Sequence, residues 1–241
     1  MTQKAMRILA LDTALNACSV ALSEDETILA FHHEERARGH AETLLPIIKS
    51  LMTEAHTRFE DLDMIAVSVG PGTFTGLRIG LAAARGIAIA ANKPCLGITT
   101  LNTLAASVPA ELADGRIIIP AIDARRKEIY VQSYRYEDNS ARPTSIDAPQ
   151  AVEISAAHTF LPDTPFLILG SGGPLLKEAG QLEGLSFELA DLEPNPDARV
   201  IAALARERGV PVEGSPPPAP LYLRGPDAKL PGGIDPTPAK K

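Results

Sequence analysis

The chain has 241 residues, a formal net charge of −7 at pH 7 and a hydrophobic fraction of 45%. A chain of this length can bury a sizeable core, as one large domain or as two smaller ones. The acidic balance argues against this chain as the main nucleic-acid surface, because phosphates are neutralised by clustered Lys and Arg. Any polynucleotide would be held mostly by a partner protein.

The two cysteines, Cys18 and Cys95, stand in apolar surroundings without the spacing of metal ligands. We expect buried, reduced thiols, and hence a cytoplasmic protein. No signal-peptide core is evident, and the one long apolar stretch, after Gly76, is interrupted by Arg78 and Arg85. A soluble protein without membrane association is therefore expected.

Alternating and helical apolar patterns predict the elements of the first half. In chain order they are strands at 7–12, 18–22 and 27–33, a helix over 41–55, a strand at 64–69, a helix over 75–92, a strand at 95–98 and a helix over 100–107. The first three strands form an antiparallel meander with Asp12 at its first turn. Residues 109–115 are expected to form the hinge between the halves.

The second half repeats this order, with Pro120-Ala121-Ile122-Asp123 matching Leu9-Ala10-Leu11-Asp12. Its predicted elements are strands at 117–123, 128–136 and 166–169, a glycine loop at 170–173 and a closing helix over 197–208. Two matched features in the same order predict a duplicated α/β unit. From Glu213 on, eight prolines in 29 residues predict an extended tail, in which 221–224 is the one apolar patch suited to dock back.

A glycine loop, Gly70-Pro71-Gly72-Thr73, joins a buried strand to a helix and turns backbone N–H groups toward whatever lies above it, commonly an anion. It is not a Walker A loop, which needs Gly-Lys-Ser/Thr, and its glycines do not have the dinucleotide spacing. Helix capping and close packing explain the same glycines without a ligand. The residues that would hold a nucleotide under the first reading are Asp12, Thr13, Gly70, Gly72, Thr73 and Gly76.

Asp12 and Asp123 stand at strand-to-strand turns, where a carboxylate could hold a magnesium-bound phosphate or act as a base. Aspartate is also a favoured turn residue, and we prefer that reading. The five histidines form no His-Glu-x-x-His motif, and no Gly-x-Ser-x-Gly elbow is present. A zinc hydrolase or a serine hydrolase of those types has no support.

The helix after the glycine loop has small residues at 76, 80, 84 and 88 and is apolar nearly all round. Such a helix is either buried inside the domain or presents its outer face to a second protein. The residues alone leave both readings open.

Four phrases resemble the TsaB (YeaZ) family over about residues 6–230. They are Leu-Asp-Thr at 11–13, Gly-Pro-Gly-Thr-Phe-Thr-Gly-Leu-Arg-Ile-Gly at 70–80, Gly-Ile-Thr-Thr-Leu at 97–101 and Tyr-Leu-Arg at 222–224. The resemblance implies a duplicated, two-lobed α/β ASKHA (actin, sugar kinase, Hsp70-like) fold with mixed sheets flanked by helices. We expect lobes at 1–108 and 109–212 and a tail at 213–241. The resemblance also implies a role in making threonylcarbamoyladenosine at position 37 of tRNA.

The same resemblance implies a non-catalytic scaffold subunit. The catalytic work belongs to a TsaD-type partner, whose metal-binding His-x-x-x-His falls here on Thr100 and Leu104, neither of which replaces an imidazole. A TsaE-type ATPase joins the pair, tRNA is reached through the complex, and no cofactor is required. Whether the free chain forms a homodimer stays open, as does a weak nucleotide site in the cleft or at the subunit interface.

The resemblance implies that the helices at 41–55 and 75–92 form the partner interface. The small, apolar residues of the second helix would allow a partner helix to approach closely. The candidate contacts are Leu44, Ile48, Leu51, Phe74, Leu77, Arg78, Gly80, Ala83, Ala84 and Ile87. The alternative function is an enzyme in its own right, either an ASKHA-type nucleotide-binding enzyme or a glycopeptidase-like hydrolase.

Overall fold

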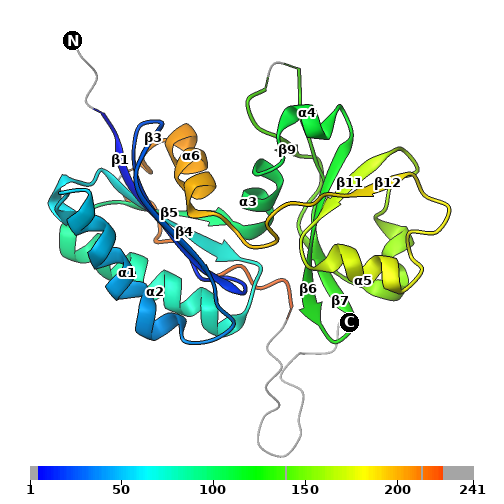
Figure 1. The fold of residues 1–241 in the computed structure, drawn as a ribbon, viewed down its shortest axis with the longest axis horizontal. Coiled ribbons are helices and arrows are strands. Elements are labelled where there is room, and N and C mark those ends of the chain that lie inside the picture. Colours follow the sequence, from blue (N-terminus) through cyan, green and yellow to red (C-terminus); the bar gives the residue numbers. More distant parts are fainter. Residues whose placement is uncertain (1–4, 139, 213, 225–241) are drawn as a thin grey trace, which may run out of the picture.

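The computed structural model describes residues 5–138, 140–212 and 214–224, which form two mixed sheets flanked by helices (Figure 1). The first sheet has the strand order β3-β2-β1-β4-β5. Its strands are β1 (Arg7–Asp12), β2 (Ala17–Glu24), β3 (Thr27–Glu35), β4 (Met64–Gly70) and β5 (Cys95–Thr99). The first three are antiparallel, whereas β4 and β5 run parallel to β1, so the predicted meander is confirmed.

The second sheet has the order β10-β7-β6-β11-β12, and β8 and β9 extend it from β6. Its strands are β6 (Ile117–Arg125), β7 (Glu128–Val131), β8 (Tyr134–Arg135), β9 (Thr144–Ser145), β10 (Gln150–Glu153), β11 (Phe166–Leu169) and β12 (Phe187–Leu189). Here too an antiparallel set precedes two parallel strands on the other side of the central strand. The predicted duplication is therefore confirmed, and the topology is that of the expected ASKHA fold.

Two helices cover one face of the first sheet, α1 (His40–Glu54) and α2 (Phe74–Ala91) (Figure 1). Each presents an apolar stripe to the strands, through Leu44 and Ile48 in α1 and through Leu81 and Ala84 in α2. Helix α2 is capped by Thr73, whose side chain accepts a hydrogen bond from the Gly76 N–H. Within the described residues, α2 alone is long and apolar enough to cross a membrane by length and composition, a test that core helices also pass.

The helix that ends each half packs against the sheet of the other half. Helix α3 (Thr100–Ala106) inserts Leu101 and Leu104 among residues of the second sheet. Helix α6 (Ala198–Arg208) packs Ile201 and Ala205 on the first sheet. Residue 108 lies between the strands of the two sheets, and α6, which follows the second sheet along the chain, packs on the first.

Several elements differ from the sequence expectation. The hinge at 109–115 contains a short helix, α4 (Ala110–Ala113), and the strand predicted over 128–136 is broken into β7 and β8. The helices η1 (Phe59–Asp61), η2 (Ile154–Thr159) and α5 (Gly172–Glu178) complete the fold. Strands β9, β10 and β12 were not predicted, because they are short and, unlike the equally short but fully buried β11, lack a continuous apolar run.

Residues 216–224, here called the strap, run from the first lobe to the second. The Leu221 N–H donates to the Val69 carbonyl oxygen at 2.7 Å, and Arg85 Nε donates to the Pro218 carbonyl oxygen at 2.9 Å. At its far end, Arg224 reaches the turn between β6 and β7. The prediction that 221–224 docks back is therefore confirmed, and the strap fastens the two lobes together.

Candidate functional site

The glycine loop packs directly on the turn that follows β1. The Thr73 N–H donates to the Ala14 carbonyl oxygen at 2.8 Å, and the Thr13 hydroxyl donates to the Gly76 carbonyl oxygen at 2.7 Å. The structure thus brings the predicted ligand residues together. The Thr13 and Thr73 hydroxyls, however, are already hydrogen-bonded to the backbone of Gly76.

Glycine is needed in this loop because the two backbones approach so closely. A Cβ on Gly72 would lie 2.5 Å from the Ala14 carbonyl oxygen, and one on Gly76 would lie 2.0 Å from that of Thr13. The second lobe repeats the arrangement, since a Cβ on Gly170 would lie 2.6 Å from the Ala121 carbonyl oxygen. Both glycine loops therefore allow close packing, the first on the turn that follows β1 and the second on β6.

Gly70 contributes in a different way. It adopts a φ of 106°, which favours glycine, and its Cα faces the strap, with the Leu221 carbonyl oxygen 3.0 Å from where a Cβ would stand. The loop is consequently covered on one side by residues 13–14 and on the other by the strap.

Asp12 is fully buried at the end of β1. Its Oδ2 accepts a hydrogen bond from the Ala14 N–H at 3.3 Å, while Oδ1 has no partner among the described residues. Burial raises the pKa of the Asp12 carboxyl to about 7, against the opposing influence of Ser68 and the Ala14 N–H. A carboxyl so enclosed is poorly placed to meet a ligand from solvent.

Asp123, the matching residue of the second lobe, is engaged in its own turn. Its Oδ1 accepts from the Arg125 N–H at 2.7 Å, and its Oδ2 lies 3.1 Å from Arg125 Nη1. Its own N–H donates to the Ser171 hydroxyl at 3.0 Å. These contacts fit the interpretation of Asp123 as a residue that stabilises its own turn.

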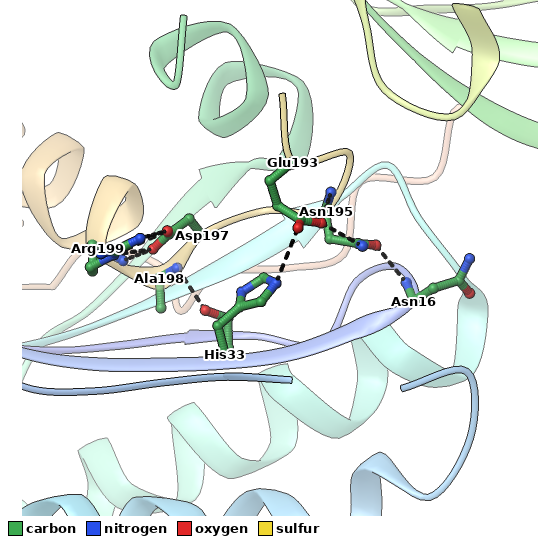
Figure 2. Close-up of polar contacts among 8 residues, drawn as sticks. Asn16, His33, Glu193, Asn195, Asp197, Ala198 and Arg199 are labelled. Atoms are coloured by element: carbon green, nitrogen blue, oxygen red, sulfur yellow. Dashed lines mark hydrogen bonds and ion pairs between the residues drawn. The ribbon is translucent and has the colours of Figure 1, made fainter. Parts of the chain in front are cut away.

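The segment that leads from β12 back to α6 crosses over the turn after β1 (Figure 2). The Asn16 N–H donates to Asn195 Oδ1 at 3.1 Å, and Asn195 donates in turn from Nδ2 to Glu193 Oε1 at 2.8 Å. His33 on β3 places Nε2 3.9 Å from Glu193 Oε2. Sequence reasoning missed this polar crossing, because its partners lie far apart along the chain.

The start of α6 is fastened to the same sheet (Figure 2). The Ala198 N–H donates to the Ser19 hydroxyl at 2.9 Å, and the Asp197 carboxylate caps the helix by accepting from the Arg199 N–H at 2.7 Å. The crossing segment thus joins the second lobe to the first sheet at α6, whereas the strap joins the lobes beside α2.

The outer face of α1 and α2 is the second candidate site. The structure reduces the number of predicted interface residues that reach this surface. Six of the ten predicted interface residues face the sheet and are buried: Leu44, Ile48, Leu51, Leu77, Gly80 and Ala84. They are enclosed within the chain, so the other four predicted residues are the ones that offer surface to a partner. The most apolar stripe of an amphipathic helix faces its own core.

The remaining four candidates reach the surface, with Phe74 and Arg78 exposed and Ala83 and Ile87 half-buried. Two further large apolar side chains of α1 and α2, which were not among the predicted interface residues, are also exposed: Leu45 at 56% and Ile89 at 82%. A contiguous group of exposed apolar side chains would indicate a surface that meets another protein. We define the helical face as Leu45, Phe74, Arg78, Ala82 and Ile89.

An aromatic cluster closes one end of the helical face. The rings of Phe74 and Tyr222 stack with centroids 5.7 Å apart, and the Arg78 guanidinium lies 3.6 Å from the centre of the Phe74 ring. Arg78 Nε also donates to the Tyr222 hydroxyl at 3.2 Å. The strap is thereby continuous with the helical face.

Within the described residues, no group of three or more His, Cys, Asp and Glu side chains is arranged to hold a metal ion. Thr100 and Leu104 are both fully buried.

Comparison with known proteins places this fold and these residues in context. A model of the family described as TsaD, tRNA N6-adenosine threonylcarbamoyltransferase, matches residues 29–163. The tRNA threonylcarbamoyladenosine biosynthesis protein TsaB of Bacillus subtilis (strain 168) is 31% identical over 207 residues, which cover 84% of this chain and 88% of that protein.

The TsaB protein of Escherichia coli (strain K12) is 42% identical over 134 residues, 56% of this chain, and the match spans only 57% of its length. Among solved structures, YeaZ from Pseudomonas aeruginosa aligns with a TM-score of 0.72 at 28% identity, covering 90% of this chain and all of that one. A second structure from Pseudomonas aeruginosa, described as similar to the peptidase YEAZ, aligns with a TM-score of 0.74 at 29% identity over 91% of this chain and all of that one.

Proposed function

The chain belongs to the TsaB (YeaZ) family, and from this premise we propose that it is a non-catalytic subunit in the synthesis of N6-threonylcarbamoyladenosine in tRNA. In this role it binds and activates a TsaD-type transferase subunit in the cytoplasm. The relatives named for this biosynthesis support the pathway. The observation that carries the subunit role is the exposed apolar helical face.

The helical face suits a helix-on-helix interface. Small residues such as Ala82 and Gly86 stand between the larger Phe74 and Ile89 along the outside of α2 and allow a second helix to approach closely. Aromatic and arginine side chains, here Phe74 and Arg78, are the residue types enriched at the centre of interfaces. The chain itself matches the TsaD family model over α1 and α2, so a TsaD-type partner would offer a similar pair of helices.

The proposal requires no nucleotide. The glycine loop and Thr13 are occupied by one another, and Asp12 is buried. A TsaE-type ATPase completes the proposed assembly, and tRNA reaches this chain through the complex. The alternative, an enzyme of its own with peptidase-like or nucleotide-binding activity, is favoured only by the description of a structural relative as similar to a peptidase.

A drop-out assay tests the proposal. Purified TsaD-type subunit, TsaE-type ATPase, threonylcarbamoyl-adenylate and tRNA are combined with and without this chain, and modified nucleoside is measured by mass spectrometry. We expect activity only when the chain is present, and equal activity with Asp12→Asn. Full activity without the chain would overturn the proposal, and loss of activity with folded Asp12→Asn would favour an enzyme with its own site.

A further inference from the structure

The turn between β6 and β7 consists of three consecutive cationic residues in an unfavourable conformation. Arg125, Arg126 and Lys127 have φ angles of 64°, 54° and 64°, and all three are exposed. Residues other than glycine, asparagine and aspartate rarely adopt this left-handed region. Asparagine or glycine would form the turn with less strain, so cations stand where the backbone disfavours them.

The surrounding structure holds this turn on both sides. Arg224 of the strap donates from Nη1 to the Ala124 carbonyl oxygen at 3.1 Å and to Glu128 Oε2 at 2.7 Å. On the other side, the N–H of Ile154, the first residue of η2, donates to the Lys127 carbonyl oxygen at 2.8 Å. A strained backbone conformation persists only where the surrounding structure holds it in place, and such conformations are more frequent at functional sites.

The turn is locally positive in an acidic protein. The residues from Asp123 to Glu128 together with Arg224 carry four cations against two carboxylates, whereas the whole chain has a net charge of −7. The Arg125 side chain pairs with Asp123 yet remains 74% exposed. Three cations at the exposed tip of a hairpin suit the phosphates of an extended polyanion.

The turn also adjoins the helical face. Tyr222 stacks on Phe74 of α2, and Arg224, two residues later, contacts the turn. Two residues span at most about 7 Å of chain. The turn therefore lies close to the Phe74 end of the helical face, next to the surface where the proposed partner subunit would bind.

We propose that the turn 125–127 is a phosphate contact for the tRNA substrate, an inference that rests on the proposed function. The turn positions the RNA backbone electrostatically and reads no sequence. RNA is favoured over an acidic protein because the substrate of the proposed complex is itself a polyanion.

The test is a triple variant, Arg125→Asn, Arg126→Gly and Lys127→Asn, in complex with the TsaD-type subunit. The new residues tolerate positive φ, so the variant should unfold at the same or a higher temperature than the wild-type chain. Its affinity for tRNA, measured by filter binding between 50 and 300 mM salt, should fall at least tenfold at low salt. The slope of log K against log salt should become less steep by roughly 2, the value for losing about three phosphate contacts.

Two control variants separate charge from strain. His56→Asn replaces another non-glycine residue at positive φ, here 48°, by a residue that tolerates this conformation. Arg58→Gln removes a cation that is far from the turn in the sequence and whose side chain is 76% exposed. Both should leave tRNA affinity unchanged. An equal loss in Arg58→Gln would mean that any surface cation contributes, which would overturn the proposal.

Complex formation is measured separately, by titrating each variant with the TsaD-type subunit. If the complex forms and the triple variant keeps both the affinity and the slope, the turn proposal is wrong while the subunit role stands. If the triple variant loses the protein partner instead, the turn belongs to a protein contact and the RNA proposal is again overturned. Failure of the wild-type chain to bind that subunit would count against the proposed function.

Discussion

The Thr13 hydroxyl donates a 2.7 Å hydrogen bond to the Gly76 carbonyl oxygen, while a Cβ on Gly76 would lie 2.0 Å from the Thr13 carbonyl oxygen. The first turn of α2 thus rests on the backbone that follows β1. Because neither backbone can yield locally, we expect Gly76→Ala to lower the free energy of unfolding by about 2–4 kcal/mol. Urea unfolding followed by circular dichroism measures this loss.

Gly86 on the same helix is the matched control for Gly76. It is exposed, and a Cβ there would meet nothing within 4 Å. Gly86→Ala should therefore raise the free energy of unfolding by roughly 0.5–1 kcal/mol through helix propensity. If Gly76→Ala and Gly86→Ala both changed the free energy of unfolding only slightly, the close approach of Gly76 to Thr13 would be contradicted.

Asp12 should make stability depend on pH. Burial raises its pKa from the ordinary 3.8 to about 7, so between these values the unfolded chain releases this proton more readily than the folded one. The contribution of Asp12 to the free energy of unfolding is most favourable below pH 4, decreases as the pH rises toward 7 and no longer changes above pH 7. The full difference corresponds to at most roughly 4 kcal/mol.

Asp12→Asn removes that titration and keeps an oxygen acceptor for the Ala14 N–H. We expect the variant to match the wild-type chain near pH 4 and to exceed it by up to a few kcal/mol at pH 8. Urea unfolding at pH 4.5, 6 and 8 gives the comparison. A constant difference between the two proteins across this range would show that Asp12 is not the titrating group.

Much of the fold could be predicted, because its central strands carry local signals. The bounds of β1 and β11 were predicted to the residue, and the matched phrases ending in Asp12 and Asp123 indicated the duplication. The exchange of α3 and α6 between lobes could not be predicted. Their apolar stripes show that each is buried, but a stripe does not identify the sheet that buries it.

The candidate site was harder to predict for the same reason. Helix α2 is apolar on several faces, so the sequence could not distinguish Leu77 and Ala84, which face the core, from Ile89, which faces outward. The strap was predicted to dock, but its contacts with Arg85 and Glu128 join residues about 100 or more positions apart. No local pattern records such pairs.

The ion pair between Arg224 and Glu128 should stabilise the docked strap. The Nη1 to Oε2 distance is 2.7 Å, and both side chains are mostly buried, at 21% and 26% exposure. We expect Glu128→Gln to lower the free energy of unfolding by about 1 kcal/mol. The chemically matched change Glu188→Gln, in a pair with Arg116 where Glu188 is 48% exposed, should have less effect.

A double-mutant cycle with Arg224→Met isolates the pair energy. A coupling energy near zero, with Glu128→Gln no more harmful than Glu188→Gln, would mean that the strap is held by its backbone contacts alone.

Both thiols should be unreactive in the folded chain. Burial raises the pKa values of Cys18 and Cys95 to about 11, so little thiolate exists at pH 8. We expect a slow reaction with Ellman's reagent at pH 8 and a rapid reaction of both after unfolding in urea. An added exposed cysteine, Ser50→Cys on α1, should react at once in the folded chain and serves as the positive control.

Ile89 is the sharpest probe of the helical face. Its side chain is 82% exposed at the outside of α2, so Ile89→Asp should leave the free energy of unfolding within about 0.5 kcal/mol of the wild-type value. Its affinity for the TsaD-type subunit, measured by calorimetry, should fall more than tenfold, because a carboxylate would be buried in an apolar contact. Gly80→Arg is unsuitable as a probe, since a Cβ there already lies 2.7 Å from Thr13 Oγ1 and the fold would be disturbed.

Val212→Asp is the matched control for Ile89→Asp, because Val212 is 81% exposed and lies outside the helical face. Val212→Asp introduces the same charge at an equally exposed position. Because this position lies outside the helical face, affinity for the TsaD-type subunit should be unchanged. Equal losses in both variants would reflect net charge rather than a contact. Normal binding by a folded Ile89→Asp variant would move the interface away from the outer face of α2.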